Sequence, residues 1–183
     1  MLARISRPAR AFRPHWLAAL LLVIVSKNFA QPNSEPQLEA AYLINFMKYV
    51  EWPASARNTA SICLFGRDTL GPLLSSHEGR MIGGKELRIL RVSSPADMAS
   101  CQLVYIPDVE EARIGAVLRW TQGMPILTAS SADGFARAGG GIEFVRHGGR
   151  MQFIVNASSL LQQGLTASSQ MMRLAFRVIG GER

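Results

Sequence analysis

The stretch Glu39–Pro53, EAAYLINFMKYVEWP, predicts the helix on which the rest of the domain is built. At about 100° per residue, one broad face of this helix carries its large apolar side chains, which are Leu38, Tyr42, Leu43, Phe46, Met47, Tyr49 and Val50. Asn45, Lys48 and Glu51 form a narrow polar stripe on the other side. Pro53 ends the helix because a proline disfavours the helical conformation in the residue before it. A helix this apolar must pack against a sheet or a partner, so we expect a core element.

Charged residues are unevenly distributed along the chain, which has 183 residues, 48% of them hydrophobic, and a formal net charge of +7. This length and apolar content suit one domain with a core. Five of the 20 basic residues lie in the first thirty positions, where there is no acid: Arg4, Arg7, Arg10, Arg13 and Lys27. The remaining fifteen are balanced by 13 acidic residues. We expect no nucleic-acid partner, because no basic stripe remains to bind phosphates.

The first thirty residues are typical of an export signal. Their arginines precede the uninterrupted apolar run Trp16–Val25, which is shorter than the ~20 residues that a membrane-spanning helix needs. Ala30 supplies a small residue before the expected cut, although Asn28 is not the usual residue at the third position back. We therefore predict a cleaved signal peptide at 1–30 and a periplasmic location, with an uncleaved N-terminal anchor as the alternative. A polar spacer is expected at 31–37 and the folded domain at 38–183.

Short apolar runs alternate with helical segments along this domain. Strands are expected at 61–66, 85–92, 101–106 and 125–128, and helices at 70–77, 109–122, 133–138, 157–163 and 169–179. Two further strands, 141–146 and 150–155, are joined by the turn His147–Gly149 and form a hairpin. This order predicts a single α/β domain. Its sheet should be mainly parallel and twisted, with helices on both faces and a late antiparallel hairpin.

Cys63 and Cys101 are the two cysteines of the chain, and each falls in a predicted strand. An even number of cysteines in an exported protein favours a disulfide, and closing this loop would stabilise the fold by about 4 kcal/mol. The alternative is two unpaired core cysteines, because adjacent strands can hold the two Cα atoms too far apart. A zinc site that adds His77 and His147 is disfavoured, since none of the four residues has a ligand-pair spacing.

No motif in the sequence supports catalysis or a cofactor. The segment Gly79–Lys85, GRMIGGK, imitates a phosphate-binding loop, but a strand follows it instead of a helix N-terminus, so we interpret it as a turn. Gly139–Gly141 likewise leads into a strand. No G-x-S-x-G elbow surrounds any serine. Asp133 and Glu143 are better explained as a helix start and an exposed strand face than as paired catalytic carboxylates. The sequence therefore predicts no enzyme, cofactor or metal site.

The segment AAYLINFMKYVEWP at 40–53 resembles the opening signature of the YfiR family of periplasmic proteins, Tyr-Leu-x-Asn-Phe-x-Lys-Tyr/Phe-Val-x-Trp-Pro. The resemblance extends from about Glu39 to Val178. It includes ICLFG at 62–66, Gly84-Lys85 before the second strand, CQLVYI at 101–106, PILTASSADGFARAGGGIEFV at 125–145 and NASSLLQQGLTASSQMMRLA at 156–175. Several ordered blocks at the right separations make this resemblance specific.

The resemblance implies a periplasmic α/β protein without catalytic residues, which binds the periplasmic domain of a membrane-bound diguanylate cyclase and holds it inactive. It implies that envelope or redox stress relieves this inhibition, often through an outer-membrane, peptidoglycan-binding lipoprotein. Cys63 and Cys101 fall where the family commonly has a disulfide. Some members carry a second cysteine pair near the C-terminal hairpin, and this chain has none there. Redox control through that second site is therefore not expected.

We expect a regulatory binding protein that lowers cyclic-di-GMP signalling and biofilm formation. The runner-up is a periplasmic small-molecule binder associated with a transporter or receptor, since open α/β sheets offer a crevice at the strand carboxyl ends. An undetected hydrolase is third. The sequence does not identify the partner interface, and it leaves a homodimer open. The apolar late helices either present Met, Leu and Phe side chains to a partner or bury them in the core.

Overall fold

Helix α1 (Glu35–Tyr49) begins earlier than the sequence pattern indicates. The computed structural model describes residues 34–54 and 57–181, so the predicted signal peptide and residues 31–33 of the predicted spacer lie outside the described residues. Residues 35–37, expected in the spacer, form the first turn of α1. The Ser34 N–H donates to the Gln37 side-chain oxygen at 2.9 Å. This capping contact, together with Pro36 in the first turn, favours the early start.

The apolar side of α1 packs into the core, as its pattern predicts. Its buried residues are Glu39, Ala40, Leu43, Ile44, Phe46 and Met47. Asn45 and Lys48 of the predicted polar stripe are exposed. The centroid of the Phe46 ring lies 6.0 Å from that of Phe144 and 5.1 Å from that of Phe153, both in the sheet. These aromatic contacts hold α1 against one face of the sheet.

The C-terminal end of α1 differs from the prediction. The helix ends at Tyr49, because the chain extends at once into strand β1 (Val50–Glu51). This strand pairs antiparallel with β9 (Thr166–Ala167) in a separate two-stranded sheet. The long-range pairing therefore ends the helix before Pro53 can do so.

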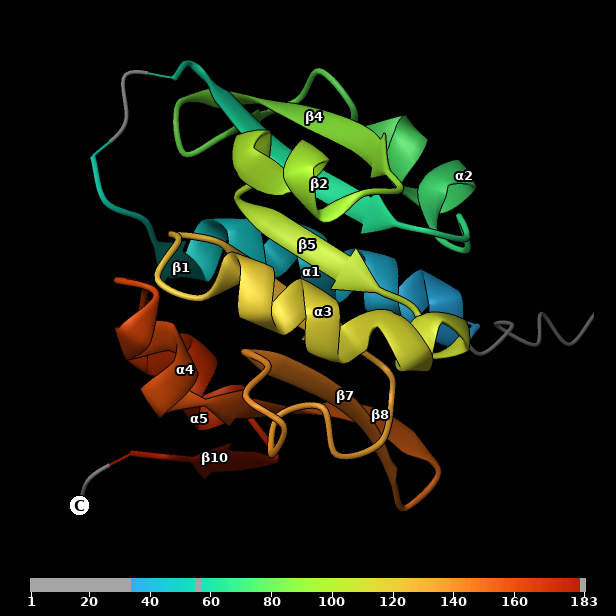
Figure 1. Cartoon of the computed structure of the whole chain (residues 1–183), viewed down its shortest axis with the longest axis vertical. Helices are drawn as coiled ribbons and strands as arrows, with labels where there is room; N and C mark the ends of the chain where they lie inside the picture. Colours follow the sequence, from blue (N-terminus) through green and yellow to red (C-terminus); the bar gives the residue numbers. More distant parts are fainter. Residues whose placement is uncertain (1–33, 55–56, 182–183) are drawn as a thin grey trace, which may run out of the picture. The chain divides into compact units, whose positions relative to one another are not determined.

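In the described part of the chain, eight strands form the main sheet, in the order β10-β8-β7-β6-β5-β2-β4-β3. Along the chain they are β2 (Thr59–Phe65), β3 (Met81–Ile82), β4 (Lys85–Val92), β5 (Leu103–Ile106), β6 (Leu127–Ser130), β7 (Ile142–His147), β8 (Arg150–Asn156) and β10 (Arg177–Ile179). Neighbouring described strands are parallel except for β7–β8, the predicted hairpin, and β3–β4. The predicted mainly parallel sheet is confirmed, and Figure 1 labels β10, β8, β7, β5, β2 and β4 in this order across it.

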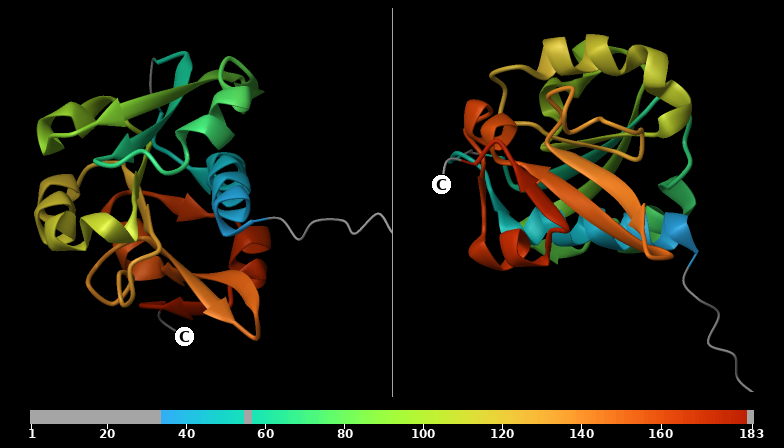
Figure 2. Two further views of the ribbon diagram at one scale, coloured as in Figure 1. Left: turned by 90° about the vertical axis from the view of Figure 1, so that its right-hand side faces the viewer. Right: turned by 90° about the horizontal axis from the view of Figure 1, so that it is seen from below.

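Helices cover both faces of the sheet. On one face, α1 shares a buried cluster with Leu74 of α2 (Gly71–Leu74), Leu160 of α4 (Ala157–Gln162) and Met171 of α5 (Ser169–Leu174). On the other face, Ile114 and Val117 of α3 (Glu111–Thr121) pack in a second cluster. Figure 2 shows α1 and α3 on opposite sides of the strands. The described residues also contain three short 3-10 helices, η1 (Ser75–His77), η2 (Pro95–Ser100) and η3 (Asp108–Glu110).

The predicted helix at 133–138 is wrong, because these residues form a run of turns. The carboxylate of Glu143, on β7, accepts hydrogen bonds from the N–H groups of Gly134 at 3.0 Å and Ala136 at 2.9 Å. Gly134 has a φ of +75°, which a right-handed helix does not allow. Glu143 itself is buried, so its predicted place on an exposed strand face is also wrong.

The predicted helix at 169–179 is correct only in its first half. α5 ends at Leu174, Ala175 is extended, and the chain continues as β10. The Phe176 N–H donates to the Phe153 carbonyl of β8 at 2.9 Å, and β10 then pairs in parallel with β8. Pairing with a strand more than twenty residues earlier overrides the local helical preference of this segment.

Candidate functional site

A disulfide joins Cys63 of β2 to Cys101, which lies just before β5. The two Cα atoms are 5.8 Å apart, and both side chains are buried in the cluster that α3 covers. Because both sulfurs are in this bond, neither is left as a free thiol or as a zinc ligand. Within the described part of the chain, no group of three or more His, Cys, Asp or Glu side chains is placed to hold a metal ion.

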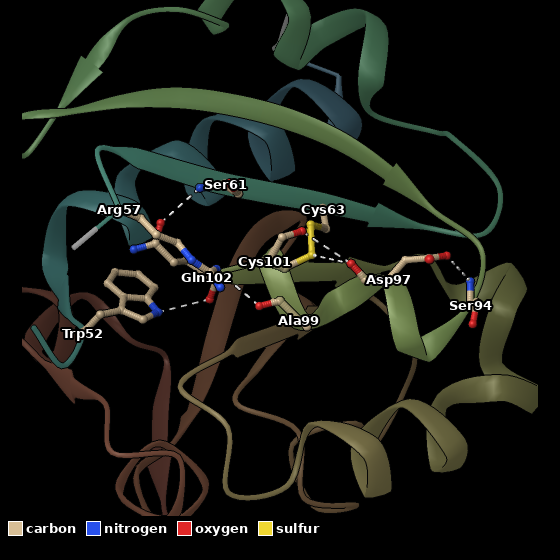
Figure 3. Close-up of a disulfide and its surroundings, with 10 residues drawn as sticks. Trp52, Arg57, Ser61, Cys63, Ser94, Asp97, Ala99, Cys101 and Gln102 are labelled. Atoms are coloured by element: carbon tan, nitrogen blue, oxygen red, sulfur yellow. Dashed lines mark hydrogen bonds between the residues drawn. A yellow bond between two sulfur atoms is a disulfide. The ribbon is translucent and has the colours of Figure 1, made fainter. Parts of the chain in front are cut away.

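Hydrogen bonds fix the chain beside the disulfide, as Figure 3 shows. The Trp52 Nε1–H donates to the Gln102 carbonyl at 3.1 Å, and the Gln102 side-chain oxygen accepts from the Ser61 N–H at 3.0 Å. The Arg57 guanidinium donates to the Ala99 carbonyl at 3.3 Å. A cavity of about 380 Å³ at the amino end of β5 is bordered by Trp52, Arg57, Ala99 and Gln102. The segment that follows α1 is thus tied to the turn that carries the disulfide.

The structure also places Gly79–Lys85, which imitates a phosphate-binding loop in sequence, and His77, a candidate zinc ligand. Gly83 and Gly84, with φ values of +56° and +79°, form the turn between β3 and β4, which confirms the turn predicted within Gly79–Lys85. His77 lies in η1, where burial lowers its pKa and the charges of Arg80 and Lys48 lower it further. The neutral imidazole is therefore favoured there.

A cavity of about 570 Å³ lies at the carboxyl ends of β5 and β6, where open α/β sheets place their ligands. Tyr105 of β5 and Ser131, just after β6, line it from the sheet, and Glu39 lines it from α1. At the same cavity, Arg146 of β7 forms an ion pair with Glu35. The position of this cavity matches the crevice expected for a small-molecule binder.

Glu39 is a buried acid of this carboxyl-end cavity that the sequence pattern did not single out. Its carboxylate accepts a hydrogen bond from the Tyr105 hydroxyl at 2.6 Å, and the Tyr105 and Ser131 hydroxyl oxygens are 3.2 Å apart. Burial raises the pKa of Glu39, and the negative charges of Asp108 and Glu35 add to this, although the two hydroxyl groups lower it. Tyr105 lies 66 residues from Glu39, so periodicity could not reveal the pair.

The late apolar residues are divided between core and surface. Met171 of α5 is buried, but Leu174, Phe176 and Val178 have 65%, 38% and 38% of their surface exposed. We call these three side chains, with the outermost strand that follows α5, the β10 edge. β10 ends the main sheet and has β8 as its neighbour. An apolar surface thus lies along one edge of the sheet.

Basic side chains accompany the β10 edge. From residue 144 to residue 181 the chain contains no acid, while it has four arginines, all exposed: Arg146, Arg150, Arg173 and Arg177. The ring centroids of His147 and Phe176 lie 4.6 Å apart, which brings the tip of the hairpin to this edge. The Arg177 guanidinium lies 5.6 Å from the centroid of the Phe176 ring. The edge therefore combines exposed apolar surface with positive charge.

Solved structures share this fold at low sequence identity. The ABC domain in complex with L-Trp from Streptococcus pneumoniae matches with a TM-score of 0.53 and 12% identity, over 76% of this chain and 60% of that chain. A conserved domain protein from Vibrio cholerae O1 biovar El Tor matches with a TM-score of 0.51 and 11% identity, over 79% and 60%. This chain therefore spans about 60% of the length of either, and the likeness concerns the fold alone. None of the curated proteins matches the chain.

The sequence also matches a protein-family model over residues 36–176, described as YfiR/HmsC-like. The match runs from the first turn of α1 to Phe176, immediately before β10. It includes Cys63 and Cys101 as well as the residues of the carboxyl-end cavity from Pro36 onward.

Proposed function

The chain belongs to the YfiR/HmsC-like family, and we propose that it is a periplasmic protein that binds and represses a membrane-bound diguanylate cyclase. The family is one of regulatory, non-catalytic proteins that act on diguanylate cyclases. In this proposal the partner surface is the periplasmic domain of the cyclase, and repression lowers intracellular cyclic-di-GMP. An outer-membrane, peptidoglycan-binding lipoprotein is proposed as a second partner, one that relieves the repression.

The β10 edge is the observation that best supports a binding role. Protein interfaces have an apolar centre and are enriched in aromatic and arginine side chains. Leu174, Phe176 and Val178 supply the apolar surface, and Arg173 and Arg177 lie among them in the chain. A partner that covers this edge would remove the exposed apolar side chains from water.

A repressor without catalytic groups acts through differential affinity. It lowers the active fraction of the cyclase because it binds the inactive state more tightly than the active state. A change in the active fraction from 99% to 1% requires about 5.5 kcal/mol of such preference. An interface with a desolvated apolar centre can supply a difference of this size, whereas surface ion pairs alone contribute little.

Deletion of the gene tests the proposed function directly. Intracellular cyclic-di-GMP and surface attachment should both rise in the deletion strain. The rise should disappear when the gene of the neighbouring cyclase is also removed. Unchanged cyclic-di-GMP in cells shown to express both proteins would contradict the proposal.

Complementation with surface variants tests the role of the β10 edge. Leu174→Asp places a charge at the edge, and we expect it to abolish most of the repression that the wild-type gene restores. Met81→Asp is the matched control, because Met81 is 67% exposed and lies on β3 at the opposite end of the sheet. Immunoblots should show equal amounts of both variants. Equal repression by both variants would place the interface elsewhere.

The carboxyl-end cavity favours one second candidate function, the binding of a small periplasmic molecule. Its volume of about 570 Å³ is within the range of ligand pockets, and Glu39, Tyr105 and Ser131 bring polar groups to it. A genomic neighbour that encodes a transporter or receptor would support this function. A thermal-shift screen of periplasmic metabolites against the wild type and Tyr105→Phe would test it, and a shift that is equal in both would count against this cavity.

A further inference from the structure

The outer side of β10 is an unpaired sheet edge among the described residues. On its inner side, the Phe176 N–H donates to the Phe153 carbonyl, and the Gly180 carbonyl accepts from the Ser158 hydroxyl of α4. Backbone groups of successive strand residues point in opposite directions. Asn156 of β8 donates its N–H to the Gly141 carbonyl on the β7 side, so Ile154 and Asn156 face β7. Their β10 partners, Arg177 and Ile179, therefore bond toward β8. Val178, between them, directs its N–H and C=O groups away from β8. These groups can pair with an additional strand.

Charge decides between the strands that could occupy this edge. A second copy of the chain would bring Arg173 and Arg177 of both copies together, and charged side chains on an edge strand are a known obstacle to self-pairing. An acidic strand would instead gain ion pairs with these two exposed arginines. The absence of any acid from residue 144 to residue 181 leaves no acidic residue of that segment to compete for them.

We propose that the β10 edge accepts an extended acidic strand of the cyclase's periplasmic domain, which joins the main sheet beside β10. This inference rests on the proposed function. Backbone hydrogen bonds to the N–H and C=O groups of Val178 hold the strand, as in other cases of β-strand addition. Acidic side chains of the strand pair with Arg173 and Arg177, and apolar ones cover Leu174. The partner thus extends the sheet instead of docking on a helix.

Amide hydrogen exchange tests the geometry of this pairing. The exported protein is saturated with the purified periplasmic domain of the neighbouring cyclase, and exchange is followed at single residues by NMR. The outward amide of Val178 should exchange at least tenfold more slowly in the complex, while those of Arg177 and Ile179 face β8 and should change less. The inward amide of Phe176 is already bonded to β8 and should change less. Unchanged exchange at the Val178 amide in the saturated complex would overturn the inference.

Charge reversal tests the choice of an acidic partner. The variant Arg173→Glu, Arg177→Glu should bind the cyclase domain at least tenfold more weakly, and with a weaker dependence on salt. The control is Arg67→Glu, Arg80→Glu, which changes the net charge equally at two exposed arginines outside the β10 edge. Val178→Pro removes the outward N–H without changing charge and should also weaken binding. Circular dichroism should show that each variant is folded, and equal affinities throughout would overturn the inference.

Two other occupants are distinguished in the same experiments. Protection of the Val178 amide by phosphatidylglycerol vesicles, without binding of the cyclase domain, would assign the edge to a membrane surface and overturn the inference. Protection that grows with protein concentration alone would assign it to a second copy, with the same consequence. If the cyclase domain binds without protecting the Val178 amide, the inference fails, but a rise in cyclic-di-GMP on gene deletion still supports the proposed function.

Discussion

At the scale of single residues, Glu39 connects one buried carboxyl group to the stability of the domain. Burial raises the pKa of Glu39, so the folded state holds this proton more tightly than the unfolded chain does. The sign of the pH dependence follows from linkage. The neutral Glu39 carboxyl contributes its full stabilisation below the pKa of about 4.3 that it has in the unfolded chain. This contribution is lost as the pH rises through the pKa of Glu39 in the folded state. Ionised Glu39 is therefore a cost to the fold at neutral pH.

The variant Glu39→Gln should be more stable than the wild type at pH 7.5. The glutamine side-chain oxygen can still accept the hydrogen bond from the Tyr105 hydroxyl, while the buried negative charge is removed. The advantage should shrink as the pH is lowered toward 4, because the wild-type carboxyl is then neutral. Urea unfolding at several pH values measures this difference. Glu51→Gln, at an exposed position, is the control, and a wild type that is the more stable protein at pH 7.5 would contradict the prediction.

At the scale of elements, the disulfide and the order of strands decide which parts of the sheet are fixed. Cys63 and Cys101 connect β2 to the start of β5 in the middle of the sheet. β10, at the end of the sheet, is three residues long and pairs with β8 alone among the described strands. The centre of the sheet is therefore cross-linked, whereas β10 is held by hydrogen bonds and side-chain packing.

Removal of the disulfide should destabilise the domain by about 4 kcal/mol, because the unfolded chain regains the freedom of the closed loop. The test compares urea unfolding of the wild type with that of Cys63→Ala, Cys101→Ala. A reductant should lower the stability of the wild type and leave the double variant unchanged. Mass spectrometry without reductant should show the loss of two hydrogens. Free alkylation of both thiols in the folded, unreduced protein would contradict the bond.

The local pattern of the sequence predicts some elements well and others poorly, for physical reasons. α1, β4 and the β7–β8 hairpin follow from side-chain periodicity and glycine turns, which are local signals. β10 was missed because the segment after Ser168 has good helix formers, and its pairing with β8 is a long-range contact. The β10 edge could not be predicted either, since its exposure depends on the order of strands in the sheet. Glu143 was misplaced because its partners are the backbone amides of a turn.

At the scale of the whole molecule, charge and apolar content separate the first thirty residues from the rest. The start of the chain has five basic residues and no acid, whereas the remainder is nearly balanced. None of the described helices is long and apolar enough to cross a membrane. The N-terminal apolar run lies outside the described residues, so its role remains a prediction from sequence.

Export predicts a mature protein that begins near Gln31. A signal peptide is removed during secretion, so N-terminal sequencing of protein from the periplasmic fraction should start at or close to this residue. A variant with Arg13 and Leu20 replaced by Glu, which interrupts the charged and apolar regions, should stay in the cytoplasm. Recovery of protein with intact Met1 from the membrane pellet would instead support an uncleaved anchor.

The bond between Cys63 and Cys101 makes a covalent ring of the chain between them, which contains β3 and β4. A protease that cuts once inside this ring produces a nicked molecule whose two pieces stay joined. A single cut after Leu174, outside the ring, releases the terminal peptide with β10. The edge formed by β3 and β4 is therefore retained after a nick. The β10 edge, which is proposed to hold the partner, is the one that proteolysis can remove.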